Sequence, residues 1–267
     1  MNRPLFLRTW RAQRLKLSVV SMGLMIWGFL PPVIYAQFGS QFQALLQTGI
    51  IPEQFVRFGG GDIFSLPGSI ALGFIHPVAI ILTAVFAVGF STSAVAGERQ
   101  RGTLEVVLAR PISRRTHYLT LLAASFGFVA ITIAALLVGS VSGSTFAGVI
   151  GELAVGNVPL LWLNGVLLFG SFASIGLAAS VSFDRLTSAL GVTLAFVVVM
   201  YFLDVLGSLW PDAEFLQPYS LFHYLKAKAV LTGAAEPFDF AVLATVIMVT
   251  MVWALVVFPS RDLAAPS

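Results

Sequence analysis

The sequence predicts an all-α integral membrane protein with six transmembrane helices. The chain is 58% hydrophobic and only 10% charged, whereas ordinary soluble domains carry about 25% charged residues. Apolar runs of about 20 residues recur along it, and this is the length that crosses a hydrocarbon core about 30 Å thick. No polar stretch is long enough to form a soluble domain, so we expect one membrane domain over residues 1–267.

The N-terminal region, residues 1–16, places five Lys and Arg residues among Leu, Phe and Trp. This pattern predicts an amphipathic interfacial helix in the headgroup region of a membrane. The apolar run 17–38 follows it. A signal-peptide core is the alternative, but the run exceeds the usual 7–15 residues and ends in Ile34-Tyr35-Ala36, without a clear small-x-small cleavage site. We therefore interpret 17–38 as the first span.

The other spans are expected at about 70–96, 117–142, 158–182, 186–207 and 240–258. A polar, Gly-rich loop precedes the second, and a charged connection at 97–116 follows it. Only residues 183–185 separate the fourth span from the fifth, so these two should be antiparallel neighbours. The stretch 208–239 is apolar and aromatic but interrupted by prolines, which favours a re-entrant or interfacial helical hairpin, because non-helical backbone at membrane depth needs a covering of protein or water.

The distribution of Lys and Arg predicts the orientation. If both termini are cytoplasmic, twelve of the fifteen basic residues lie on the cytoplasmic side. The other three are Arg57, Lys226 and Lys228. Short cytoplasmic loops carry an excess of Lys and Arg, so the charged connection should face the cytoplasm.

The charged connection has the features of a short folded element. Thr103 can cap a helix start, and Leu104, Val107 and Leu108 then form one apolar stripe at helical spacing. Pro111 stops that helix. Ser113 can cap the next one. Such a helix has no neighbour of its own between two spans, so we expect a partner protein to bind it.

The run G-E-R-Q-R-G-T-L-E-V-V-L-A-R-P-I-S-R-R resembles the loop between the second and third spans of ABC-2 type permeases, the membrane subunits of a class of ABC transporters. The matching residues are Glu98, Gly102, Thr103, Leu104, Glu105, Pro111, Ser113 and Arg114. The family often has a Lys shortly into the third span, where this chain reads Tyr118-Leu119-Thr120-Leu121. The resemblance therefore assigns no role to Thr120.

The resemblance implies a coupling helix that sits in a groove of a separate ABC ATPase subunit. Under it, the ATPase-coupling residues are Glu98, Arg99, Arg101, Gly102, Thr103, Leu104, Glu105, Val107, Leu108, Pro111 and Arg114. It also implies a second permease subunit, identical or closely related, and an exporter in a prokaryotic cytoplasmic membrane. By the same resemblance, the segment before the last span would cap the pathway on the outside.

Several kinds of catalytic site are excluded. A P-loop needs Gly directly before its Lys, but Lys16, Lys226 and Lys228 follow Leu or Ala. The chain also lacks His-Glu-x-x-His and Gly-x-Ser-x-Gly, and it has no Cys for thiolate chemistry or disulfides. We expect no enzyme activity and no bound cofactor or metal, with ATP and Mg on the partner ATPase. The sequence pI near 9.5 reflects membrane topology rather than nucleic-acid binding, and membrane lipid is the expected surrounding.

A few polar or small residues within the spans permit two interpretations each. Asn164 and Asp204 are possible pathway residues, but Asn164 could bond a neighbouring helix and Asp204 could simply reach water. His76-Pro77 indicates a kink rather than a ligand. Small residues recur at four-residue spacing at Gly139 and Gly143, and at Gly170, Ser174 and Ala178. These rows favour helix packing within the chain over a dimer interface.

Other functional classes stay open at this level. A secondary carrier should have intramembrane ionisable residues and broken spans in paired halves, and Asp204 is the one candidate for such a residue. A membrane-embedded enzyme would need a nucleophile, an acid–base pair or a metal cluster inside the spans. A membrane scaffold or assembly protein without ATP coupling is a further alternative.

Overall fold

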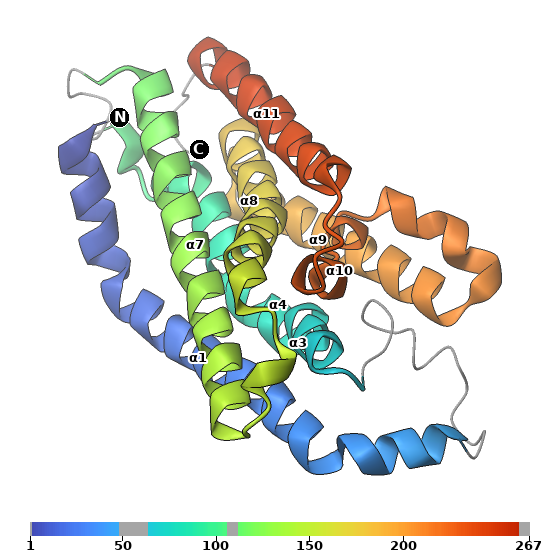
Figure 1. The fold of residues 1–267 in the computed structure, drawn as a ribbon. Helices are drawn as coiled ribbons and strands as arrows, with labels where there is room; N and C mark the ends of the chain where they lie inside the picture. The colour runs from blue at the N-terminus through green and yellow to red at the C-terminus, as the bar shows by residue number, and fades with distance from the viewer. Residues whose placement is uncertain (1, 48–63, 106–111, 262–267) are drawn as a thin grey trace.

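A computed structural model describes residues 2–47, 64–105 and 112–261. Its regular structure is helical, and no strand occurs within these ranges (Figure 1). Within these ranges, five helices are long and apolar enough to cross a membrane. They are α1 (Arg3–Gln47), α7 (Arg114–Phe146), α8 (Val158–Ser182), α9 (Leu186–Leu209) and α11 (Pro237–Ser260). The chain is therefore an all-α integral membrane protein, as the sequence predicts.

The expected second span is a bent series of helices. It comprises α3 (Leu66–Ile75), α4 (Pro77–Ala84), the π-helical turns η1 (Val85–Phe90) and η2 (Ser93–Gly97), and α5 (Glu98–Gln100). The axis bends by 48° at His76, between α3 and the helix that follows. His76 has extended backbone angles because Pro77 follows it, and its Nδ1 accepts a hydrogen bond from the Val78 N–H at 3.3 Å. If α3 and the following helix form one span, the spans number six.

The N-terminal helix α1 runs without a break from Arg3 to Gln47, so no boundary separates an interfacial helix from the first span near residue 16. At 1.5 Å per residue it is about 68 Å long, roughly twice the thickness of a hydrocarbon core. Its start is held along α7: the Asn2 N–H donates to Thr120 Oγ1 at 2.9 Å, and the Trp10 ring lies 4.8 Å from that of Phe128. The N-terminal turns therefore pack on the bundle, as Figure 1 shows.

Glycines bring α1 and α7 into direct backbone contact. A methyl group at Gly139 would lie 2.0 Å from the Met25 carbonyl oxygen, and one at Gly143 would lie 2.3 Å from that of Phe29. On α1, Gly28 fits against the Leu136 carbonyl in the same way. Because residue numbers rise together along both helices, α1 and α7 are parallel. The prediction that Gly139 and Gly143 serve packing within the chain is confirmed.

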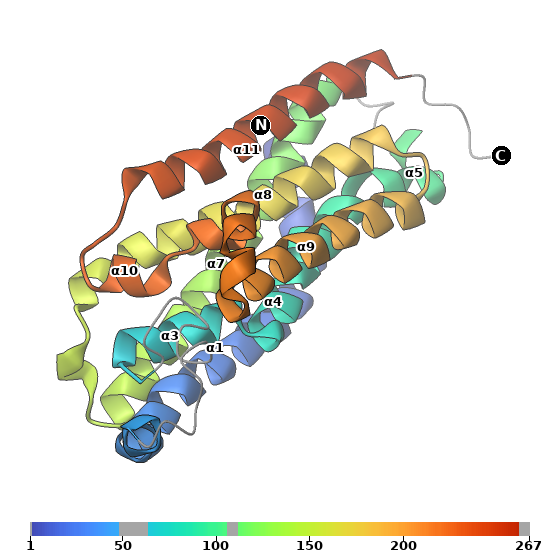
Figure 2. The ribbon, with the colours of Figure 1, turned by 90° about the vertical axis from the view of Figure 1, so that its right-hand side faces the viewer.

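The segment between α9 and α11 is made of short turns. It contains η5 (Pro211–Tyr219), η6 (Phe222–Tyr224) and α10 (Ala227–Leu231), of which η5 and η6 are 3₁₀ helices. Gln217 Nε2 donates to Ser208 Oγ at 2.9 Å, and Ser220 Oγ donates to the Met200 carbonyl at 2.6 Å. The expected interrupted segment thus folds back on the end of α9 (Figure 2). Two more 3₁₀ turns, η3 (Ile150–Glu152) and η4 (Val155–Asn157), connect α7 to α8.

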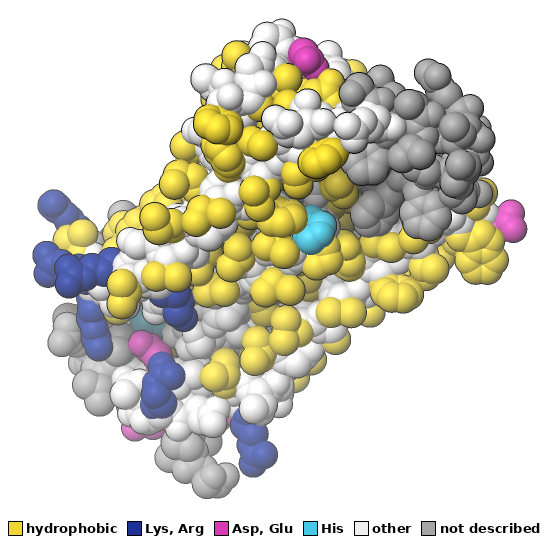
Figure 3. Space-filling model, turned by 90° about the horizontal axis from the view of Figure 1, so that it is seen from below, with side chains coloured by type: hydrophobic (Ala, Val, Ile, Leu, Met, Phe, Trp, Pro, Cys, Tyr) yellow, Lys and Arg dark blue, Asp and Glu magenta, His cyan; other side chains and the backbone are white. Residues whose placement is uncertain are grey.

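Helix α8 is the most buried of the long helices, with 72% of its most apolar stretch buried, whereas only 17% of that stretch is buried in α9 and 11% in α11. Val198 and Phe202 of α9 and Trp253 and Val256 of α11 are each more than half exposed. Figure 3 shows hydrophobic side chains over the middle of the visible face, with Lys and Arg gathered toward one end. We call the end formed by α5, the first turn of α7, residues 183–185 and the last turn of α11 the basic end.

Candidate functional site

The charged connection begins at the basic end with a tight turn. The Thr103 N–H donates to the Glu98 carbonyl and the Gly102 N–H to the Arg99 carbonyl, both at 2.9 Å. These two bonds form a Schellman motif, which ends a helix when the first residue past it adopts the left-handed conformation. Gly102 is that residue, with φ of 67°. Helical residues resume at Leu104. The Thr103 hydroxyl donates to the Glu98 carbonyl at 3.1 Å. Val107, Leu108 and Pro111 lie outside the described residues.

Two other elements hold this turn in place. Arg99 forms an ion pair with Asp184 at 2.7 Å, and Arg261 binds the same Asp184 oxygen. Gln100 Oε1 accepts a hydrogen bond from the Leu186 N–H at 3.2 Å, at the start of α9. One carboxylate in the short connection between α8 and α9 therefore joins the charged connection to the end of α11.

The start of α7 is joined to the end of α11 as well. Ser113 Oγ accepts from the Thr116 N–H at 3.2 Å, so the predicted cap is confirmed. The Arg114 guanidinium donates to the carbonyls of Phe258 at 3.1 Å and Arg261 at 2.6 Å. The last carbonyls of a helix lack partners within the helix and carry partial negative charge, so a cation is favourable there. Arg114 is thus used within the chain.

Glu98 lies partly buried at the inner side of the turn. Burial raises the pKa of the Glu98 carboxyl above its ordinary value of 4.5, and the positive charges of Arg8 and Arg101 oppose that shift. Its Oε2 is buried without a hydrogen-bond partner among the described residues. Arg8 belongs to α1, so the electrostatic environment of Glu98 includes the N-terminal helix.

The side chain of Leu104 is only 2% exposed and belongs to the chain's own hydrophobic core. This corrects its interpretation as an apolar anchor on a partner, because a buried side chain offers no surface for docking. Leu104, the residue after Thr103, inserts instead into the membrane domain. Around it, the exposed residues are Gln100, Arg101, Gly102, Thr103 and Glu105.

The turns of η1 and η2, which lead into the charged connection, are stabilised by Ser180 of α8. Its hydroxyl accepts from the N–H groups of Val95 at 3.0 Å and Ala96 at 2.8 Å, and it donates to the Thr92 carbonyl at 2.7 Å. Gly176 permits this approach, because a methyl group there would lie 2.2 Å from Ser91 Oγ. A widened helical turn leaves backbone groups to be satisfied from outside, and one side chain does so here.

A comparison with protein families decides the identity of this arrangement. The model described as ABC-2 family transporter protein matches residues 15–263, which includes the charged connection and all the long helices except the start of α1. The chain belongs to the ABC-2 transporter family. No curated protein matches it. It is therefore a multi-pass membrane permease component of an ABC transporter, in a family whose members work with an ABC ATPase and often with a second permease subunit.

The two polar residues considered for the pathway of this ABC-2 permease both bind the segment between α9 and α11. Asn164 of α8 is buried, and its Nδ2 donates to the Tyr224 carbonyl at 3.0 Å. The backbone carbonyl of Asp204 on α9 receives a hydrogen bond from Ser208 at 2.9 Å and a longer one from Gln217 at 3.4 Å. Asn164 thus bonds the short 3₁₀ helix η6, rather than one of the long helices.

Several residues of the basic end escape prediction from the sequence. Asp184 and Arg261 appear there only as isolated charges in a short connection and a tail, and pairing between residues so far apart has no local signal. Ser180 is one of many hydroxyls in apolar helices, and the π-helical turns that it satisfies leave no recognisable pattern. By contrast, Gly102 before Thr103 is a recognisable helix-end signal.

Proposed function

We propose that this ABC-2 permease is the membrane subunit of an ATP-driven exporter, and that the charged connection couples it to a separate ATPase subunit. The basic end then faces the cytoplasm, in agreement with its concentration of Lys and Arg. ATP and Mg would bind the partner, since no lysine of this chain follows a glycine as a P-loop requires.

The observation that carries this proposal concerns the segment 99–105, which exposes charged side chains on one side and contacts the membrane domain on the other. Arg101 and Glu105 are exposed, while Leu104 between them is buried in the membrane domain. Arg99 is bound to Asp184. Charged side chains on a rigid support favour recognition by a partner, because little conformational entropy is lost on binding.

The same contacts provide a route for motion. The charged connection continues into span two through α5, η2 and η1, and it is linked through Asp184 to the α8–α9 connection and to the end of α11. Displacement of the segment by an ATPase would therefore tilt span two and shift the ends of three other helices. That shift would open the pathway alternately to the two sides of the membrane.

A second permease subunit is expected at the exposed apolar faces of α9 and α11. Their described side chains, among them Phe202 and Trp253, have few neighbours within the chain. A pathway enclosed by two subunits requires each to present such a surface, whereas the highly buried α8 cannot do so.

Co-purification with the ATPase tests the coupling role. Arg101→Ala and Glu105→Ala remove exposed charges on the segment, and truncation of an interface contact typically costs about 1–2 kcal/mol. The double variant should bind the ATPase at least about tenfold more weakly. Arg115→Ala is the matched control, because Arg115 is exposed at the same end but lies on the first turn of α7. Equal retention of the ATPase by the double variant and the wild type would refute the coupling role of these side chains.

Reporter insertion tests the orientation. Gly102 and Gly233 both have positive φ and lie in turns at opposite ends of the spans, where insertions are best tolerated. A reporter at Gly102 should be cytoplasmic and one at Gly233 should lie on the other side of the membrane. The reverse pattern would exclude a cytoplasmic ATPase at the basic end.

A further inference from the structure

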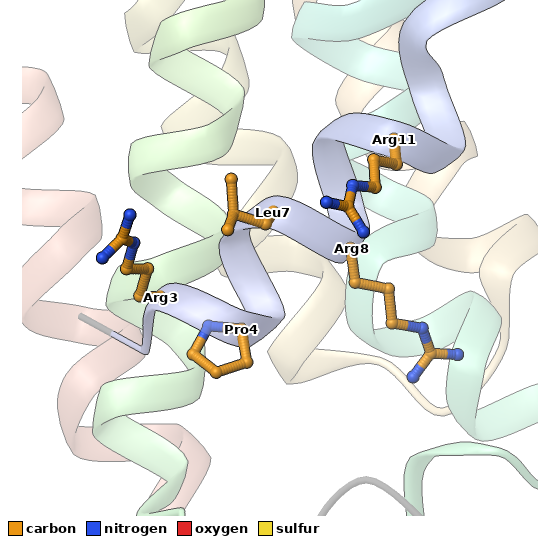
Figure 4. Close-up of a pocket in the computed structure, with 5 residues that line it drawn as sticks. All are labelled: Arg3, Pro4, Leu7, Arg8 and Arg11. Atoms are coloured by element: carbon orange, nitrogen blue, oxygen red, sulfur yellow. The ribbon is translucent and has the colours of Figure 1, made fainter.

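The start of α1 contains a groove that the coupling proposal does not use. It has a volume of about 440 Å³ and is lined by Arg3, Pro4, Leu7, Arg8 and Arg11. Figure 4 shows Arg3 and Arg11 on either side of Leu7, with Arg8 turned away from them. All five residues are exposed. Three cations and two apolar side chains thus share one face of three helical turns.

The opposite face of these turns is fixed to the bundle. The Asn2 N–H is bonded to Thr120 Oγ1, and the Trp10 ring packs between those of Phe6 and Phe128 at 5.6 and 4.8 Å. A methyl group at Gly127 would lie 2.7 Å from the Trp10 ring. The backbone beneath the arginines is therefore held in place, so the starting points of their side chains are fixed.

The register between α1 and α7 gives the depth of the groove. Asn2 lies beside Thr120 and Trp10 beside Phe128, whereas α7 begins at Arg114 at the basic end. At 1.5 Å per residue, the groove extends from about 9 to about 21 Å along α7 from its start. A hydrocarbon core about 30 Å thick and centred on the 33 residues of α7 would begin about 10 Å from the start of that helix. Arginines facing outward at the depth of the groove would border this core, where an unpaired charge is costly and requires an anion or water.

The geometry of the side chains indicates where that anion comes from. Side chains on a helix point toward its N-terminus, and the N-terminus of α1 is at the basic end. The guanidinium groups therefore extend back toward the membrane surface, as arginines near the ends of spans do. A guanidinium binds phosphate through parallel N–H donors, while Leu7 and Pro4 supply apolar surface for an acyl chain.

We propose that this groove binds the headgroup phosphate of an anionic phospholipid from the leaflet at the basic end. Arg3 and Arg11 would hold the phosphate across Leu7, and the acyl chains would run down the exposed side of α1. A lipid fits better than a soluble anion, because all five lining residues lie on α1, a membrane-spanning helix, rather than in a loop between spans. The site is independent of the coupling role proposed above.

The test measures binding of phosphatidylglycerol to the purified full-length chain in detergent by native mass spectrometry. Arg3→Gln combined with Arg11→Gln removes the two residues that flank Leu7. Arg14→Gln with Lys16→Gln is the matched control, since both residues are exposed on α1 but lie outside the groove. The groove variant loses two charge-assisted guanidinium–phosphate contacts and should bind phosphatidylglycerol roughly 30-fold more weakly, while the control, which has no such contact, should stay close to the wild type.

Three further arms decide the interpretation. Phosphatidylcholine should bind weakly to every variant, and inorganic phosphate should fail to displace phosphatidylglycerol. Arg3→Lys with Arg11→Lys should retain a preference for the anionic lipid, with lower affinity because Lys lacks the two-pronged geometry. If the groove and control variants lost phosphatidylglycerol affinity equally, the binding would reflect general charge attraction, and the proposal would be overturned. Displacement by inorganic phosphate would overturn the lipid assignment.

Discussion

Replacement of Ser180 by Ala tests the hydrogen bonds that support the π-helical turns. The hydroxyl is 1% exposed, and it is the described acceptor for the N–H groups of Val95 and Ala96. A buried donor left unsatisfied costs about 1–3 kcal/mol, so the loss of the acceptor for two donors should destabilise the chain by about 2–6 kcal/mol. An ordinary interhelical hydrogen bond in a membrane protein averages only about 0.6 kcal/mol. The two effects are therefore separable by measurement.

The assay is unfolding in mixed detergent micelles, followed by the fluorescence of the five Trp residues. Ser125→Ala is the matched control, because Ser125 is equally buried but, among the described residues, its hydroxyl bonds to the Leu121 carbonyl of its own helix and accepts from no backbone N–H. That substitution leaves no backbone donor unsatisfied and should cost less than about 0.5 kcal/mol. If Ser180→Ala destabilised no more than Ser125→Ala, the N–H groups of Val95 and Ala96 would not depend on this hydroxyl, and the argument would fail.

Three other perturbations follow from the same contacts. Gly139→Ala should destabilise the chain by about 1–3 kcal/mol in the same unfolding assay, because its methyl group meets a backbone carbonyl of α1. Gly191→Ala is its control: the residue lies in open space on α9, and the substitution should be neutral or stabilising by up to about 1 kcal/mol. Because burial raises the pKa of Glu98 above 4.5, the folded chain holds a proton that the unfolded chain releases, and this contribution to stability is lost as pH rises through the folded pKa. Glu98→Gln should remove that part of the pH dependence of the unfolding midpoint, and an unchanged profile would contradict the shift. Asn164→Leu should cost at most about 1 kcal/mol, since it loses one bond to the Tyr224 carbonyl but also removes a buried oxygen that has no partner among the described residues. Loss of transport with stability intact would instead indicate a pathway role.

The fold class could be predicted because membrane insertion depends on properties that add up along the chain. Long apolar runs and the distribution of basic residues indicate spans without knowledge of any contact. The parallel packing of α1 on α7 was only partly foreseeable. The small residues Gly139 and Gly143 indicate a close contact, but not which helix fills it.

The candidate site was less predictable, because its residues acquire their roles through tertiary contacts. Spacing indicates that Leu104 lies on an apolar stripe, but it cannot say whether that stripe faces a partner or the chain's own core. The structure buries Leu104 and binds Arg114 to the end of α11. The sequence predicts an interfacial helix at 1–16 and a span from residue 17, and the structure joins both in one continuous helix whose first turns pack on α7, a contact that the change in polarity does not indicate.

The direct contact between α1 and α7 has a consequence for biosynthesis. Two parallel spans cannot form as a simple hairpin. The first span must therefore stay in the bilayer without its partner until the second span has crossed back and α7 has been inserted. The intervening chain of about 110 residues takes on the order of ten seconds to synthesise. During that interval Gly28 and the exposed Met25 and Phe29 carbonyls have no partner from α7. Insertion should therefore be the stage at which this permease is most sensitive to the membrane insertase and to the lipids around the nascent first span.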